Sequence, residues 1–290
     1  MPAFSDNQLR LMFIATLTAK TLSILGCLMN FLTVILLKKI QNQFLKIILI
    51  VSSMDLIYAT FALSKDLFPI NPQVCRVMDG FSRIGFFGSI AWTCCFSHYL
   101  VSSLKKEEFD QRRQIMKRYI SIATTISIIG ALFVSLTSQY KLTQLGVCYR
   151  QTQIGSYNWE NLIGIEIPSI ITVVFCGYCY WEAYKKIRSI TGTSHKELIL
   201  YPLIIVICLL PFVTLSIRNQ IFSSDKPFVW TLVSNGMGFL QGFMNSIVFG
   251  THRRVMQLIF RRCSNDPSRE SLVSIQTDWD VRSSKTSNSL

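Results

Sequence analysis

Charged residues are scarce in this chain, and acidic residues are scarcer than basic ones. Of its 290 residues only 16% are charged, and 16 Asp and Glu stand against 29 Lys and Arg, which gives a net charge of +13. Soluble domains are usually nearer one quarter charged, so an ordinary soluble enzyme is excluded. Half of the residues are hydrophobic, which excludes disorder over most of the length. Since the basic residues lie in short clusters between apolar runs, no nucleic-acid partner is expected.

The residue patterns that carry most catalysis are also missing. The three histidines, His98, His195 and His252, share no ligand spacing, so no metal site is expected. Residues 228–249 contain no lysine that could bind retinal, and the chain has neither a phosphate-binding glycine loop nor a serine nucleophile elbow. We therefore expect no cofactor and no enzymatic activity. A receptor and a transporter remain, and the lack of obviously paired halves weakens the transporter.

The apolar residues form seven runs, each long enough to cross about 30 Å of hydrocarbon as a helix. The runs are residues 11–37, 44–63, 81–104, 119–138, 162–184, 198–217 and 228–249. The predicted fold class is therefore all-α, a seven-transmembrane helix bundle. The first run is too long for a signal peptide and has no basic leader, so we expect it to stay in the mature protein.

The distribution of basic residues predicts the orientation of the bundle. The connections after the first, third, fifth and seventh runs hold 20 of the 29 basic residues, and the opposite side holds seven. Because basic loops resist translocation, the richer side should be cytoplasmic and the amino terminus outside. This topology predicts a multi-pass protein of the plasma membrane, and anionic lipid of the inner leaflet accounts for the excess charge.

The domain prediction divides the chain after the last apolar run. Residues 1–262 form the seven-helix domain, whose last part, residues 251–262, is expected to be a short amphipathic helix on the inner membrane surface. Residues 263–290 are rich in serine and threonine and are expected to form a disordered cytoplasmic tail. Cys263 follows two arginines beside the membrane, where palmitoylation and an inert thiol are equally good interpretations.

Only two of the nine cysteines fall on the predicted outer side. Six lie inside apolar runs, where a free cysteine acts as a small apolar residue. Cys75 lies just before the third run, and Cys148 lies in the loop after the fourth. Since both face the oxidising compartment, we expect a disulfide bond that ties this loop to the third helix.

Polar residues inside the runs are the candidates for a conformational switch. Asp55 lies near the middle of the second run, and Asn30 is similarly deep in the first. Such residues are costly in a membrane, so they either bond neighbouring helices or carry an ion or proton role, and the two readings are equally favoured. Pro211 is a place for the sixth run to bend, and Asn245 adds an amide near the end of the seventh.

A second group of polar residues lies toward the predicted outer ends of the runs and forms the candidate ligand site. These residues are Lys20, Arg83, Glu166, Tyr201 and Arg218. Their basic members suggest an anionic small molecule as the extracellular ligand. The alternative, given equal weight, is that Arg83 pairs with Asp79 one helical turn away while Lys20 and Arg218 extend to lipid headgroups.

Short motifs along the chain resemble those of one receptor family. They are Ser52 to Leu56 in the second run; Cys75, Gly80-Phe81 and Ala91 to Thr93 in the third; Cys148, Trp159 and Pro168 around the fifth; Tyr201-Pro202 opening the sixth; and Gln241 to Gly250 closing the seventh. In this order they resemble the cyclic-AMP-receptor-like group of G-protein-coupled receptors, which is related at a distance to the secretin and adhesion class.

This resemblance implies a ligand-activated receptor that opens its cytoplasmic face to a heterotrimeric G protein. The third run ends in His98-Tyr99 without an Asp-Arg-Tyr triplet, and the seventh lacks Asn-Pro-x-x-Tyr, so switch residues of rhodopsin-like receptors are not transferred. The identity of the ligand is not transferred either. The alternative function is a seven-helix sensor or small-solute transporter that is not coupled to a G protein.

Overall fold

The computed structural model describes nine segments of the chain, and these are almost entirely helical. The segments are residues 5–37, 43–68, 71–103, 109–137, 140–142, 148–150, 162–189, 200–221 and 228–251. Their elements are α1 (Asp6–Leu37), α2 (Gln43–Leu67), α3 (Pro72–Ser103), α4 (Phe109–Thr137), β1 (Tyr140–Leu142), β2 (Cys148–Arg150), the π-helix η1 (Leu162–Glu166), α6 (Ile167–Ser189), α7 (Leu200–Ile221) and α8 (Phe228–Thr251). Each of the seven predicted runs coincides with a helix, with η1 and α6 together covering the fifth.

Five of these helices are long and apolar enough to cross a membrane. They are α1, α2, α3, α4 and the continuous η1–α6 segment. The apolar part of α7 is shorter, Leu203–Leu215, and α8 is not among the candidate spans found in the described residues. The seven-span count and the outward orientation of the amino terminus therefore stay predictions.

Local capping sets where two of the helices begin. Ser5 and Gln8 bond reciprocally at the start of α1, with each backbone N–H donating to the other side chain. At the start of α3, Asn71 Oδ1 accepts the backbone N–H of Val74 at 2.8 Å, and Pro72 takes the first helical position. As a result α3 begins well before the apolar run that predicted it, and Cys75 lies inside the helix.

A short hairpin between α4 and η1 was not anticipated by the sequence pattern. Its two strands pair antiparallel, with Tyr140 opposite Arg150 and Leu142 opposite Cys148. The strands have three residues each, which is too short for an alternating pattern to be recognised in the sequence. β1 lies against α3, so the hairpin is attached to the helix that holds Cys75.

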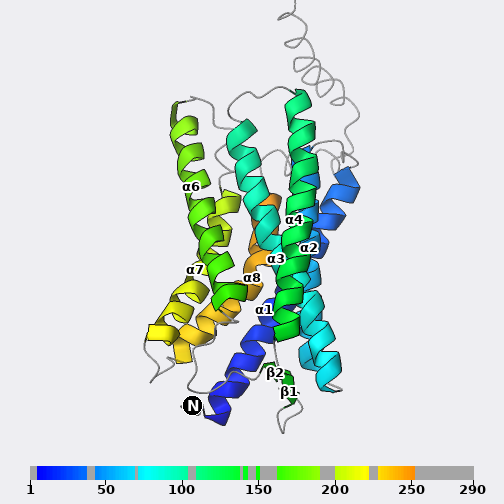
Figure 1. Cartoon of the computed structure of the whole chain (residues 1–290), viewed down its shortest axis with the longest axis vertical. Helices are drawn as coiled ribbons and strands as arrows, with labels where there is room; N and C mark the ends of the chain where they lie inside the picture. Colours follow the sequence, from blue (N-terminus) through cyan, green and yellow to red (C-terminus); the bar gives the residue numbers. More distant parts are fainter. Residues whose placement is uncertain are drawn as a thin grey trace, which may run out of the picture. The chain divides into compact units, whose positions relative to one another are not determined.

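The helix α3 is the most buried element of the described bundle and contacts most of the others. It packs against α2, α4, α6 and α7, and Figure 1 shows it running between α4 and α6. An apolar core forms around its residues Phe86, Phe87 and Ile90, with contributions from α4, η1, α6 and α7. Gly85 lets α2 approach closely, because a Cβ atom there would lie 2.4 Å from the backbone nitrogen of Tyr58.

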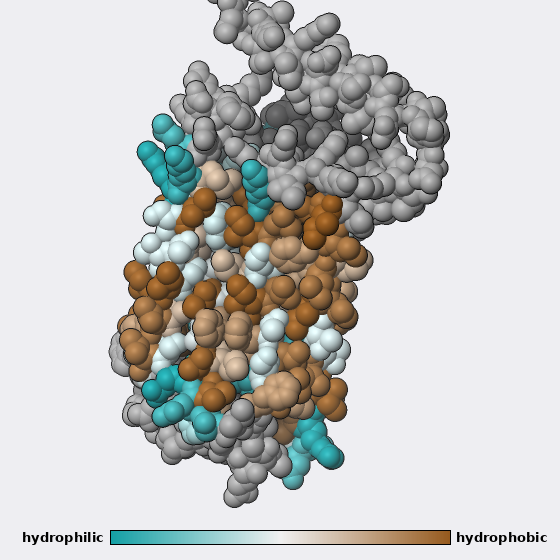
Figure 2. All heavy atoms as spheres, turned by 90° about the vertical axis from the view of Figure 1, so that its right-hand side faces the viewer, coloured by the Kyte–Doolittle hydropathy of each residue, from teal (hydrophilic) through white to brown (hydrophobic). Residues whose placement is uncertain are grey.

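The outward faces of the helices are apolar. Large hydrophobic side chains of α1, α4, α6, α7 and α8 are exposed, among them Ile35, Leu136, Val174 and Val229. Figure 2 shows hydrophobic residues over the middle of the described surface and hydrophilic residues gathered toward its two ends. This is the pattern expected of helices whose outer faces contact lipid.

Two predicted features lie outside the described residues. The predicted amphipathic helix of residues 251–262, apart from Thr251 at the end of α8, is one of them. The other is the carboxyl-terminal tail from residue 263, which includes Cys263.

Candidate functional site

Asp55 of α2 lies in a buried hydrogen-bonded cluster that joins three helices. Ser89 of α3 donates its hydroxyl hydrogen to Asp55 Oδ1 at 2.5 Å, and Asn245 Nδ2 of α8 donates to Asp55 Oδ2 at 3.0 Å. Gln241 Nε2, also from α8, lies 2.8 Å from Ser89 Oγ and 3.5 Å from Asp55 Oδ1. We call these four buried residues the central polar cluster. Its neutral donors offset the cost of burying the carboxyl group, so removing them would leave it unsatisfied.

The helix α8 reaches Asp55 because glycines lie where it packs against α1 and α2. A Cβ atom on Gly242 would lie 2.4 Å from Ser23 Oγ, 2.9 Å from Cys27 Sγ and 3.2 Å from Asp55 Cβ. A Cβ atom on Gly26 of α1 would lie 2.8 Å from the main chain of α8. Small residues permit this kind of close approach between helices in membranes. The position of α8 beside Asp55 therefore depends on both glycines.

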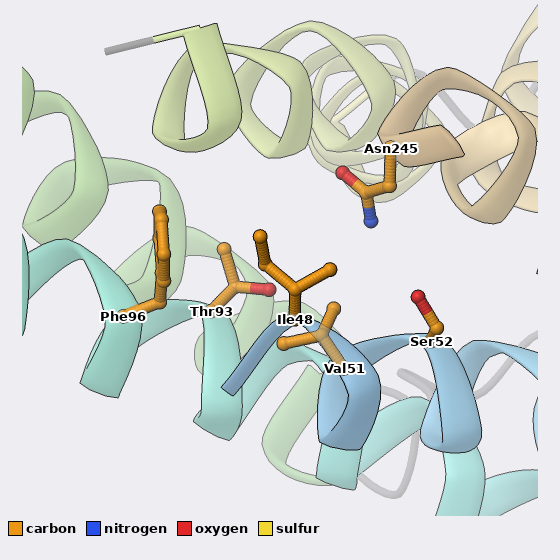
Figure 3. Close-up of a pocket in the computed structure, with 6 residues that line it drawn as sticks. All are labelled: Ile48, Val51, Ser52, Thr93, Phe96 and Asn245. Atoms are coloured by element: carbon orange, nitrogen blue, oxygen red, sulfur yellow. The ribbon is translucent and has the colours of Figure 1, made fainter. Parts of the chain in front are cut away.

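A second polar contact lies beside the central polar cluster. Asn30 Nδ2 of α1 donates to Ser52 Oγ of α2 at 2.9 Å, and both side chains are buried. Ser52 and Asn245 line a cavity of about 10 Å³, and Figure 3 shows their polar ends pointing toward each other across it. This volume is about what one water molecule requires. Three switch candidates, Asn30, Asp55 and Asn245, are thus brought into one polar region.

Five charged side chains form ion pairs near the end of α2, and we call them the charged cluster. They are Lys20, Lys65, Asp66, Asp79 and Arg83. Asp79 is buried and accepts from two cations, with Lys65 Nζ 2.6 Å from Oδ1 and Arg83 Nε 3.1 Å from Oδ2. The predicted pair between Asp79 and Arg83 is confirmed. Lys65, which follows the end of the second predicted run at residue 63, belongs to the last turn of α2.

The side chain of Lys20 is buried rather than extended toward lipid headgroups. Only 4% of the residue is exposed, and Nζ forms an ion pair with Asp66. The ammonium group also lies 4.5 Å from the centre of the Phe239 ring, and that ring stacks on Tyr58 at 5.1 Å between centroids. The outward-extending alternative for Lys20 is therefore wrong. This residue ties α1 to α2 and α8.

The buried face of α2 connects the two clusters. Ser52, Asp55, Ala59, Ala62 and Asp66 follow one another at intervals of three and four residues, which places them on one side of a helix. Asp66 was not predicted as a site residue. Its spacing of three helical turns from Asp55 nevertheless places both on one face of α2, and this could have been recognised from the sequence. The partner Ser89 had no such signal, because its rotation toward α2 depends on how α3 packs.

Pro211 lies inside α7 and is joined to α8. Its carbonyl oxygen accepts a hydrogen bond from the fully buried Ser234 hydroxyl at 2.8 Å and another from Thr214 at 3.0 Å. Proline has no N–H for the bond to the preceding turn, so α7 lacks one internal hydrogen bond at this point. The fourth switch candidate therefore lies where α7 is intrinsically weak and is held by α8.

The remaining ligand candidates lie on η1 and α7. Glu166 is buried and ends η1, directly before α6. Arg218 lies near the end of α7, and its Nη1 atom is buried with no hydrogen-bond partner in the described structure. Tyr201 lies in the first turn of α7, but its side chain is outside the described residues. Arg218 is thus the candidate with an unused buried donor.

Cys75 is disulfide-bonded and buried in the first turns of α3. Cys148 begins β2, whose partner strand lies against α3, although the side chain of Cys148 is outside the described residues. The pairing of Cys75 with Cys148 stays a prediction. Six cysteines within the described helices are free thiols: Cys27, Cys94, Cys95, Cys176, Cys179 and Cys208.

Comparison with known proteins adds no family to this geometry. No protein-family model matches the sequence, and no curated protein matches it. The resemblance to cyclic-AMP-receptor-like receptors therefore stays a prediction.

Proposed function

We propose that the chain is a cell-surface G-protein-coupled receptor of seven helices, which transmits an extracellular ligand signal to a heterotrimeric G protein. The observation that carries this proposal is the central polar cluster, in which Asp55 of α2 gathers donors from α3 and α8. A carboxyl group inside an apolar bundle is costly, and such residues in membrane helices usually serve function. When α3 or α8 shifts against α2, Asp55 can exchange its hydrogen bonds to Ser89 and Asn245 for bonds to other groups.

The helix α8 provides the mechanical link in this proposal. Its Phe239 contacts Lys20 of the charged cluster, and its Gln241 and Asn245 contact Asp55 or the Asp55 partner Ser89. Along α2 the two clusters are about 16 Å apart, from eleven residues at 1.5 Å each. A ligand that displaces Phe239, directly or by moving Lys20 against it, therefore moves the same helix that bonds Asp55. The charged cluster and the central polar cluster thus both favour or oppose the same movement of α8. Energetic coupling between two sites requires such a shared movement.

The ligand in this proposal is an anionic small molecule. Arg218 supplies a buried donor atom without a partner in the described structure, and the charged cluster holds three basic and two acidic side chains. An arginine in a poorly solvated site binds phosphate or carboxylate in two-point contact. Arg83→Gln and Arg218→Gln separate the alternatives, because only a ligand-contacting arginine lowers agonist affinity while surface expression is kept.

Guanine-nucleotide exchange in liposomes tests the proposal. The purified full chain is reconstituted with a heterotrimeric G protein, and exchange is measured with cyclic AMP and glutamate as phosphate and carboxylate probes. Exchange above that of empty liposomes, altered in Asp55→Asn, supports a receptor. The matched control is Ser53→Ala, because Ser53 Oγ bonds only its own helix at Leu49 in the described structure.

The same liposomes discriminate the alternative function. A small-solute transporter accumulates labelled probe without any G protein, whereas a receptor does not. Uptake of probe together with exchange equal to that of empty liposomes contradicts the receptor and favours the transporter.

A further inference from the structure

The outward surface between α3 and α4 is hollowed next to the end of the bundle that holds the charged cluster. The groove has a volume of about 300 Å³ and is lined by Arg76, Gly80 and Ile84 of α3 and by Ile128, Leu132 and Ser135 of α4, among others. This volume is at the low end of small-molecule sites. Leu132 and Ile128 are exposed, so the groove opens onto the apolar surface.

Gly80 creates the hollow. A Cβ atom at this position would lie 3.1 Å from Ser135 Oγ, so any side chain would fill the space between the two helices. The lining is otherwise almost entirely apolar. An apolar groove that faces lipid and is kept open by a glycine suits a hydrocarbon chain.

Two polar side chains beside the groove, those of Ser135 and Arg76, make no hydrogen bond or ion pair in the described structure. The Ser135 hydroxyl oxygen is buried from solvent and makes no hydrogen bond there. Other serines and threonines in these helices donate to a carbonyl oxygen of the preceding turn, as Ser127 of the same helix does at 2.6 Å. A buried hydroxyl left without a bond costs free energy, so Ser135 is suited to an acceptor supplied by a ligand.

Arg76 is the second such group. It is exposed near the start of α3, and no ion pair is recorded for it among the described residues, whereas Asp79 one turn further on is engaged by Lys65 and Arg83. Arg76 precedes Gly80 by one helical turn, about 6 Å along the axis. The order along the groove is therefore cation, hydroxyl and hydrocarbon surface. Phosphate, ester carbonyl and acyl chain follow one another in the same order in a phospholipid.

We propose that the groove between α3 and α4 binds one phospholipid of the surrounding bilayer, with its phosphate on Arg76, an ester carbonyl accepting from Ser135 and one acyl chain along Ile84 and Leu132. The charge of Arg76 selects a phosphate headgroup, and Gly80 admits the chain. This site is separate from the proposed ligand site and does not depend on the receptor function.

Native mass spectrometry of the detergent-solubilised full chain tests the site. The probes are phosphatidic acid and the diacylglycerol with identical acyl chains, which lacks only the phosphate. Wild-type protein should bind one phosphatidic acid about tenfold more tightly than diacylglycerol, because the arginine–phosphate contact is charge-assisted. Arg76→Gln should remove this preference, and the matched control Arg10→Gln, at another exposed arginine, should keep it.

Gly80→Leu should abolish binding of both lipids, and Ser135→Ala should weaken both to a similar degree. An unchanged thermal midpoint shows that each variant is folded. Equal binding of the two lipids by wild-type protein, or undiminished binding by folded Gly80→Leu, overturns the proposal. A protein dimer that Gly80→Leu dissociates also overturns it, because a second copy of the chain then occupies the groove.

Photolabelling of the wild-type chain tests the position of the lipid directly. Phosphatidic acid with a photoreactive acyl chain should label peptides that contain residues 80–84 and 128–135. Labelling confined to other helices would contradict the site.

Discussion

At the scale of single residues, Asp55 accepts hydrogen bonds at both carboxyl oxygens, from Ser89 on one and Asn245 on the other. Asp55→Asn can keep an acceptor toward Ser89 if the Asn245 amide flips to offer its oxygen. Asp55→Ala cannot, and it leaves buried donors unpaired at about 1–3 kcal/mol each. We expect thermal unfolding in detergent to show a small loss for Asp55→Asn and a clearly larger loss for Asp55→Ala. Equal losses would show that the side-chain bonds do not stabilise the bundle.

The charged cluster gives a second residue-scale prediction, because Lys65 and Arg83 both form ion pairs with the single carboxylate of Asp79. Removing Asp79 takes the carboxylate away from both basic side chains, while removing Lys65 or Arg83 leaves Asp79 its ion pair with the other. Breaking a buried pair typically costs about 3–5 kcal/mol, and exposure of the two basic side chains lowers this figure. Asp79→Asn should therefore lower the thermal midpoint more than Lys65→Gln or Arg83→Gln. The opposite order would mean that Asp79 is not shared.

How far the sequence predicts such sites depends on whether one helix or several create them. The spacing of Asp55 and Asp66 on α2 lies within one helix and can be read from a periodicity of 3.6 residues. The meeting of Lys20 with Phe239, by contrast, depends on the rotation of α1 against α8. That rotation is determined by close contacts such as those at Gly26 and Gly242, which no local pattern encodes.

At the scale of elements, the packing of α1 against α8 predicts a difference among glycines of similar appearance. Gly26→Ala places a methyl group 2.8 Å from the α8 main chain, which cannot move away as a side chain can. Nothing lies within 4 Å of a Cβ atom at Gly238, so Gly238→Ala is the matched control. Alanine is the better helix former by about 1 kcal/mol. We expect Gly26→Ala to lower the thermal midpoint and Gly238→Ala to keep or raise it. Similar shifts for both would contradict the close approach.

The attachment of the hairpin to α3 is the second element-scale prediction. Cys75 is disulfide-bonded, and β1, which lies against α3, pairs with the strand that begins at Cys148. Non-reducing peptide mapping should recover a linked peptide pair containing Cys75 and Cys148, and closing this long loop stabilises the fold by about 4 kcal/mol or more in the chain-entropy view. Alkylation of both thiols in surface-expressed protein would disprove the link. Cys27 and Cys95, free and buried, are internal controls for accessibility.

The helical part of the fold was predictable because each span is one long apolar run, and run length alone predicts it. The start of α3 was predicted too late, since the cap at Asn71 and Pro72 lies in a polar stretch that hydropathy does not register. The π-helix η1 was not predicted. Pro168 directly follows its junction with α6, and its missing N–H favours such an irregular turn.

At the scale of the whole molecule, the open question of topology turns on α7 and α8. The polar residues of α8 lower its average hydropathy, but Ser234, Gln241 and Asn245 are all buried against other helices. The opposite face exposes apolar side chains, among them Val229, Val233 and Ile247. A helix that hides its polar face inside a bundle needs no apolar average to cross a membrane. With 24 residues, α8 is about 36 Å long, which exceeds the hydrocarbon thickness.

The same reasoning extends to α7, whose 22 residues span about 33 Å although its continuous apolar part is shorter. If both helices cross, the bundle has seven spans and its two termini lie on opposite sides of the membrane. An epitope tag at the amino terminus should then be accessible to antibody on intact cells, and a tag at the carboxyl terminus only after permeabilisation. Accessibility of both tags on intact cells, or of neither, would mean an even number of spans. In that case α7 or α8 does not cross, and a cytoplasmic G-protein face opposite an extracellular ligand site could not be built from this bundle.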